Sequence, residues 1–126
     1  MLRRAFAFAA ALFLVLPSVA QVQRSFPATA LRGVVVFGEA PEISLNGQAG
    51  RLAPGARIRD ASNMVVTPSA VYGGRYVVHF TLDSYGLMKD VWILTAAEVA
   101  NKPWPRTLPE QQAWTFDPAA QVWTKP

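Results

Sequence analysis

Apolar and polar residues alternate most regularly over residues 75–82. Because successive side chains of a strand point to opposite faces, this pattern predicts a half-buried strand. Its apolar face carries Tyr76, Val78, Phe80 and Leu82. A second apolar run, residues 87–94, follows the turn-forming residues 83–86. We therefore expect the two runs to pair as an antiparallel hairpin.

Two registers of this hairpin fit the sequence. A four-residue loop places His79 opposite Asp90, which pairs a histidine with a carboxylate. A three-residue loop with a glycine bulge places Leu82 opposite Met88 and Phe80 opposite Asp90, which packs more apolar surface. Both registers stay open at this point.

Short β-branched or alternating runs predict further strands upstream, at residues 34–37, 42–45, 57–59 and 63–67. Asn46 and Gly47 form a dipeptide that is typical of a tight hairpin turn. Ala53-Pro54-Gly55 predicts a second change of direction.

Two capping boxes predict two short helices, because Thr95 and Thr107 are each followed three residues later by a glutamate. Downstream, residues 114–123 read as a terminal hairpin. With residues 117–120 as its loop, Trp114 falls opposite Trp123.

These elements predict one mainly β domain over residues 21–126. We expect a small, partly open β-barrel or a twisted antiparallel sheet that carries one or two short helices.

From Gly74 onward, the order of features resembles the C-terminal domain of TonB-type energy transducers. A strand, the turn Asp83-Ser84-Tyr85-Gly86, a second strand, a helix and the stretch Trp114-Thr115-Phe116-Asp117-Pro118-Ala119 follow one another. The resemblance implies an α+β fold, as an alternative, and a protein partner bound at a strand edge. The strand-rich residues 38–73 depart from that pattern. The chain as a whole is similar to short exported bacterial proteins of uncharacterised function.

Residues 1–20 have the organisation of a secretory signal peptide. Arg3 and Arg4 precede an apolar run over residues 5–16, and small residues lead to Ala20. The run is shorter than the roughly 20 residues that span a bilayer, which argues against a retained anchor. The chain has no cysteine for a lipid anchor or a disulfide. We expect a periplasmic or secreted protein, cleaved between Ala20 and Gln21, with no membrane span in the mature chain.

The mature chain keeps ten of the twelve Lys and Arg residues against eight Asp and Glu residues. This excess is too small to indicate nucleic acid. Arg51, Arg57 and Arg59 lie close together in sequence, and their guanidinium groups suit a carboxylate or a phosphate. The alternative is a solvated strand edge, where charges prevent association between sheets.

Candidate catalytic chemistry is sparse. His79 is the single histidine, and no Gly-x-Ser-x-Gly or Ser-x-x-Lys motif is present. A His79 and Asp90 pair could act as a base and its orienting group, but such a pair across a sheet is more often structural. We therefore expect no catalytic residue, no metal site and no cofactor.

The tryptophans lie in the C-terminal third, at positions 92, 104, 114 and 123. Large aromatic rings either fill a small core or form binding surfaces. Trp104 stands between two prolines and is least explained by core packing, so it is the candidate hot spot if its ring is exposed. The candidate binding residues are thus Arg51, Arg57, Arg59, Trp104 and Trp92.

These observations favour an exported, non-catalytic module that binds another envelope or secreted protein. The alternative is a small barrel of oligonucleotide/oligosaccharide-binding type that holds an anionic glycan with arginines and a tryptophan. The least favoured hypothesis is a small hydrolase built around His79.

The predicted leader is testable by mass spectrometry of the exported protein. We expect the mature chain to begin at Gln21, because signal peptidase cleaves after the small residue Ala20. A chain that keeps residues 1–20 in a membrane fraction would contradict the prediction.

Overall fold

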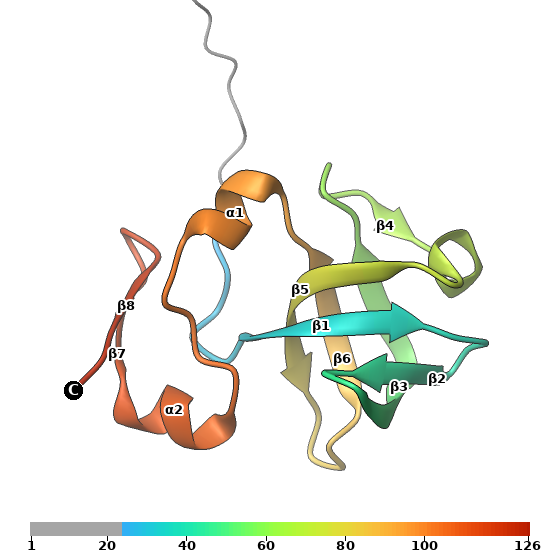
Figure 1. The fold of residues 1–126 in the computed structure, drawn as a ribbon, viewed down its shortest axis with the longest axis horizontal. Coiled ribbons are helices and arrows are strands. Elements are labelled where there is room, and N and C mark those ends of the chain that lie inside the picture. Colours follow the sequence, from blue (N-terminus) through green and yellow to red (C-terminus); the bar gives the residue numbers. More distant parts are fainter. Residues whose placement is uncertain (1–23) are drawn as a thin grey trace, which may run out of the picture.

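The computed structural model describes residues 24–126, so the predicted leader and its cleavage site lie outside the described residues. The strands are β1 (Leu31–Phe37), β2 (Glu42–Leu45), β3 (Gln48–Arg59), β4 (Val65–Val66), β5 (Arg75–Leu82), β6 (Met88–Ile93), β7 (Thr115–Asp117) and β8 (Val122–Thr124). The helices are α1 (Ala96–Ala100), α2 (Leu108–Ala113) and a 3-10 turn, Pro68–Val71 (Figure 1). In this part of the chain, no helix is long and apolar enough to cross a membrane.

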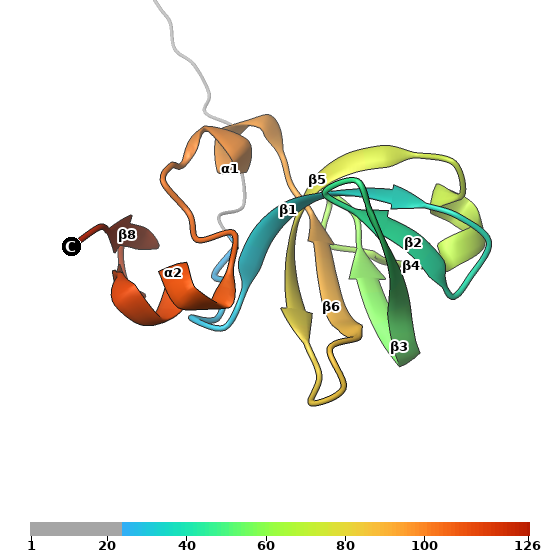
Figure 2. The same ribbon diagram turned by 60° about the horizontal axis from the view of Figure 1, so that its bottom comes forward.

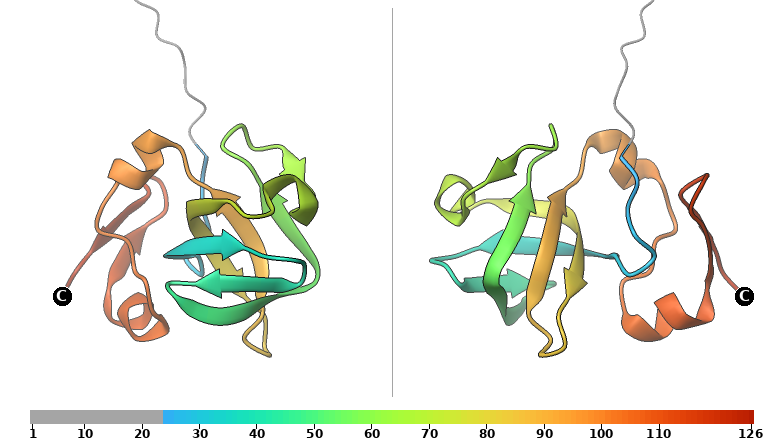
Figure 3. Two further views of the ribbon diagram at one scale, coloured as in Figure 1. Left: turned by 45° about the vertical axis from the view of Figure 1, so that its right-hand side comes forward. Right: turned by 180° about the vertical axis from the view of Figure 1, so that it is seen from behind.

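Five strands close into a barrel, which confirms the predicted mainly β fold (Figure 3). The order around the ring is β2, β1, β5, β6 and β3, and the ring closes because β2 also pairs with β3. The barrel is closed rather than partly open. It is also not wholly antiparallel, since β3 and β6 run parallel. Strand β4 pairs with the C-terminal end of β3.

Strand β3 corrects one prediction from the sequence. Residues 53–55 do not reverse the chain, because β3 runs without interruption from Gln48 to Arg59. Its first half pairs with β2 and its second half with β6, and the register shifts between Leu52 and Arg57. Gly55 takes φ +76° in this irregular stretch. A strand that bends in this way can pass from one neighbour to the next around a barrel.

The β5–β6 hairpin follows neither predicted register along its whole length. Leu82 pairs with Met88, as the bulged alternative requires. One residue further, the register shifts at Lys89, so that Thr81 rather than His79 or Phe80 faces Asp90. The bulge in β6 is the physical reason for the difference, because it adds one residue on that strand.

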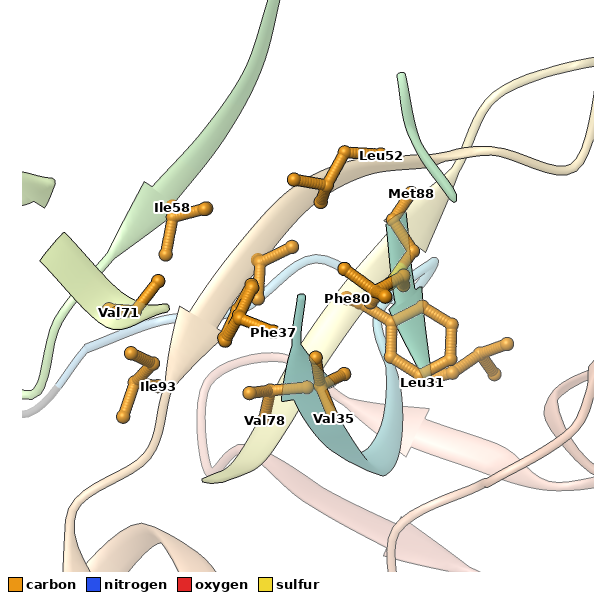
Figure 4. Packing of buried hydrophobic residues seen from close by; sticks show 12 residues of the cluster. Leu31, Val35, Phe37, Leu52, Ile58, Val71, Val78, Phe80, Met88 and Ile93 are labelled. Carbon is orange, nitrogen blue, oxygen red and sulfur yellow. The ribbon is translucent and has the colours of Figure 1, made fainter. Parts of the chain in front are cut away.

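The inward side chains of the barrel form its core (Figure 4). The predicted alternation holds here, since Val78 and Phe80 point into this cluster while His79 points outward. The largest fully buried members of the cluster are Phe37, Phe80, Ile58 and Met88.

The C-terminal segment, residues 95–126, lies beside the barrel and carries α1, α2 and the β7–β8 hairpin (Figure 2). The predicted capping box of Thr95 and Glu98 is confirmed in both directions. Thr107 caps α2, but Glu110 accepts from the backbone N–H of Arg106 instead of that of Thr107.

The terminal hairpin is shifted by two residues from its predicted register. Phe116, not Trp114, pairs with Trp123, and the two rings stack with centroids 4.7 Å apart. The loop is displaced by one residue, to 118–121, and Gln121 takes φ +57° at its end. The Asp117 carboxylate accepts from two backbone N–H groups of the turn.

Substitution Phe80→Ala tests the barrel core. We expect the free energy of unfolding to fall by about 3–5 kcal/mol, because the ring is fully enclosed and its removal leaves a cavity. Urea denaturation measures the change. Tyr85→Ala is the matched control, since that ring is 86% exposed, and its effect should stay within about 0.5 kcal/mol. Equal losses for the two variants would contradict the assignment.

Candidate functional site

A row of outward-pointing side chains crosses the barrel from β3 to β1. Arg59 faces Trp92, Trp92 faces His79, and His79 faces Arg32 in successive cross-strand pairs. The Arg59 guanidinium lies 5.9 Å from the centre of the Trp92 ring. The row therefore places two arginines, a tryptophan and the single histidine on one face.

A cluster of aromatic rings outside the barrel core covers the His79 end of this row. The rings of His79 and Trp104 stack with centroids 4.1 Å apart, and Phe26 meets His79 edge-on at 4.4 Å. The Trp104 indole donates to the carbonyl of Ala30 at 2.9 Å. Trp104 is 4% exposed, so the condition on which it was the candidate hot spot, an exposed ring, is not met. The proline-flanked linker turns this ring inward to join the barrel to the C-terminal segment.

Arg32 connects the row to α1. Its guanidinium donates to the carbonyls of Glu98, Val99 and Asn101. These carbonyls lie at the end of α1, where helix carbonyls lack regular intrahelical partners, and that of Glu98 also accepts from the backbone N–H of Asn101. Burial lowers the pKa of Arg32, and the nearby Glu98 carboxylate opposes that shift. The guanidinium stays charged, because the ordinary pKa of arginine is far above neutrality.

Arg24 makes the second connection to α1. It forms an ion pair with Glu98 and donates to the carbonyls of Asp60 and Ile93. Burial raises the pKa of Glu98, but hydrogen bonds from Arg24 and from the Thr95 backbone outweigh that effect and lower it overall. The capping carboxylate of α1 is thereby tied to the segment that precedes the barrel.

His79 is enclosed and neutral in this arrangement. Its Nε2 accepts from Arg32 at 3.2 Å, which leaves the proton on Nδ1. Burial, followed by the charges of Arg32 and Arg24, lowers the pKa of His79 to about 2. The hypothetical pair of His79 and Asp90 does not form, because Asp90 instead accepts from Thr81.

The structure separates the three candidate arginines of β3. Arg51 forms an exposed ion pair with Glu42 of β2 at 3.4 Å. Arg57 and Arg59 lie beyond the register shift, where Arg57 faces Asp90 and Arg59 faces Trp92. The sequence-predicted residues that come together on this outer face are therefore Arg57, Arg59 and Trp92. Arg51 lies apart from them, and Trp104 belongs to the buried cluster against which Trp92 packs.

A cleft of about 850 Å³ lies at the joint between the barrel and the C-terminal segment. Val34 of β1 and Val77 of β5 contribute its barrel side. Val99 and Pro103 line it from α1 and the linker, and the half-buried ring of Trp114 lines it from the end of α2. The lining is thus mainly apolar, with one aromatic ring that is accessible in part.

Cationic side chains also line this cleft. Arg32, Lys102, Arg106 and Lys125 are among its lining residues, against the single acid Glu110. Lys125 lies 5.4 Å above the Trp114 ring. Sequence reasoning missed this group because Arg32 and Lys125 are far in the chain from Lys102 and Arg106. A usable signal was present, since each exposed cation lies in the region that holds three of the four tryptophans.

Within residues 24–126, no group of three acidic, histidine or cysteine side chains is placed to hold a metal ion. No protein-family model, curated protein or solved structure matches the chain. The candidate site therefore rests on the geometry of the cleft.

Acid should destabilise the fold through His79. Its pKa is lower in the folded chain than the ordinary 6.5, so the unfolded chain takes up the proton first and stability is lost as the pH falls below 6.5. Between pH 7 and pH 5 this amounts to about 2 kcal/mol. Urea denaturation at the two pH values measures it. In His79→Gln, which keeps an acceptor for Arg32, the stability lost between the two pH values should be clearly smaller. A loss equal to that of the wild type would refute the assignment of the pH dependence to His79.

Proposed function

We propose that this chain is an exported, non-catalytic binding module and that the cleft binds a segment of another envelope or secreted protein. The observation that carries the proposal is the cleft itself, whose volume of about 850 Å³ has mainly apolar walls and a half-buried tryptophan. Pockets of this size and character are usual for specific recognition.

The lining residues favour a protein segment over a sugar. Sugar hydroxyl groups need acceptors as well as donors, and the acid of the cleft, Glu110, already accepts from the backbone N–H of Arg106. Valine and proline walls suit an apolar side chain instead. Tryptophan is also enriched among the residues that dominate protein interfaces, which supports a role for Trp114.

The proposal of a non-catalytic role is supported by the state of His79. Its Nε2 lone pair is taken by Arg32, and the ring is 1% exposed. A general base needs a free lone pair within reach of its substrate. The predicted leader supports export, and the resemblance to TonB-type domains supports a protein partner, although the cleft is not a strand edge.

A second candidate is an anionic glycan bound on the outer face of the barrel. The supporting observation is that Arg57, Arg59 and Trp92 lie together there. Five-stranded barrels of oligonucleotide/oligosaccharide-binding type bind ligands on such a face. This candidate is weaker because Arg59 already lies 3.9 Å from the Asp90 carboxylate.

Substitution Trp114→Ala tests the cleft. We expect capture of a discrete partner protein from envelope extract to fall at least about tenfold, as for loss of an interface hot spot. Quantitative mass spectrometry of immobilised wild-type and variant proteins measures it. Tyr85→Ala is the matched control, since it removes an exposed aromatic ring outside the cleft.

A second cleft variant, Val34→Glu, guards against misfolding of the first, because it charges the barrel side of the cleft and keeps the Trp114 ring. Unfolding temperatures near that of the wild type are required of both. If partner capture survives both substitutions, the cleft is not the binding site. Capture of an anionic glycan that is lost on Arg57→Ala would instead support the second candidate.

A further inference from the structure

The charges around the cleft are unbalanced. The three ion pairs found among residues 24–126 join Arg24 to Glu98, Arg51 to Glu42 and Arg59 to Asp90. All of them lie outside the set of cleft-lining cations. Within the described chain, the cations of the cleft therefore have no carboxylate partner.

Arg32 shows the imbalance most clearly. Its guanidinium is half-buried, and the groups that accept its hydrogen bonds are three carbonyls and a neutral imidazole. A positive charge held in partly desolvated surroundings by neutral acceptors attracts an anion.

Three of the cations that line the cleft, Lys102, Arg106 and Lys125, are exposed. Arg106 reaches the β2–β3 turn, where its Nη2 lies 3.4 Å from Asn46 Oδ1. Lys125 lies over Trp114. Lys102 follows directly after α1 in the chain. Lys102 and Arg106 belong to the linker between α1 and α2, and Lys125 follows β8, whereas the apolar side chains of Val34 and Val77 belong to the barrel, where β1 pairs with β5.

From this charge complementarity we propose that the cleft recognises a short, extended protein segment in which an apolar residue is flanked by acidic residues on both sides. The inference rests on the proposed function and adds the chemistry of the partner. The apolar side chain contacts the valines, and the flanking carboxylates meet Lys102, Arg106 and Lys125. Because these pairs are exposed, each contributes about two- to fivefold to affinity, and together they give selectivity.

Synthetic peptides with blocked ends test the proposal by isothermal titration calorimetry on the exported protein. The probe carries phenylalanine between two pairs of glutamates. We expect binding that weakens with salt, a loss of about tenfold or more when glutamine replaces the glutamates, and no binding when lysine replaces them. Replacing phenylalanine by serine should also cost about tenfold.

Variants of the protein locate the site. Arg106→Glu and Lys125→Glu should each lower the affinity for the acidic peptide at least about fivefold, whereas the matched control Lys89→Glu, an exposed cation outside the cleft, should not. Each variant must unfold at the wild-type temperature. An affinity lowered by Lys89→Glu but not by the cleft variants would overturn the proposal.

The outcomes separate this inference from the proposed function. If the glutamine peptide binds as tightly as the glutamate peptide and Trp114→Ala weakens both, the cleft binds protein but the acidic preference is wrong. If neither peptide binds and an oligogalacturonate does, both the acidic segment and the protein-binding function are overturned.

Discussion

The stacking of Trp104 on His79, with Arg32 bonded to the same imidazole, is the contact on which the rest of the structure depends. It joins β1 and β5 of the barrel to the linker between α1 and α2. The interaction requires a neutral histidine, because only the neutral ring offers a lone pair to the guanidinium. Burial and two nearby arginines keep it neutral by lowering the pKa of His79. The partly desolvated Arg32 guanidinium is thus accommodated without a buried anion in contact with it.

This joint also explains how a chain without disulfides holds two clusters together. The barrel encloses one apolar core, and the aromatic rings around Trp104 form a second core outside it. A surface His79 and Arg32 would remove this attachment of the C-terminal segment. Arg24 adds a second connection through Glu98. Arginines from the first part of the chain thus bind both the capping-box carboxylate and the terminal carbonyls of α1.

The candidate site follows from the same arrangement. Trp104 fills the inner part of the joint, and the space beside it, between Val77, Val99 and Trp114, remains open as the cleft. The charged groups that hold the joint form an ion pair or bind the end of α1. The cations at the rim of the cleft have no ion-pair partner among the described residues. The proposed binding of an apolar and acidic partner therefore rests on how the two parts meet.

Local sequence determined those features that depend on neighbouring residues. The alternation of residues 75–82 fixed which side chains face the core, Asn46 and Gly47 set a two-residue turn with positive φ at both positions, and Thr95 with Glu98 set the start of α1. These outcomes require no knowledge of distant contacts, because periodicity, turn conformation and capping act within a few residues.

Tertiary structure alone decided the closure of the barrel, the bends in β3 and β6, the burial of Trp104 and the meeting of Lys102, Arg106 and Lys125 at one cleft. Each of these depends on which strands become neighbours and on where an extra residue shifts a register. A shift of one residue changes every cross-strand partner, as Phe80 shows, which faces Val91 and not the Asp90 of the bulged register. Short-range patterns contain no information about such pairings. The candidate site therefore exists only in the folded chain, where the barrel is closed and the C-terminal segment packs against it.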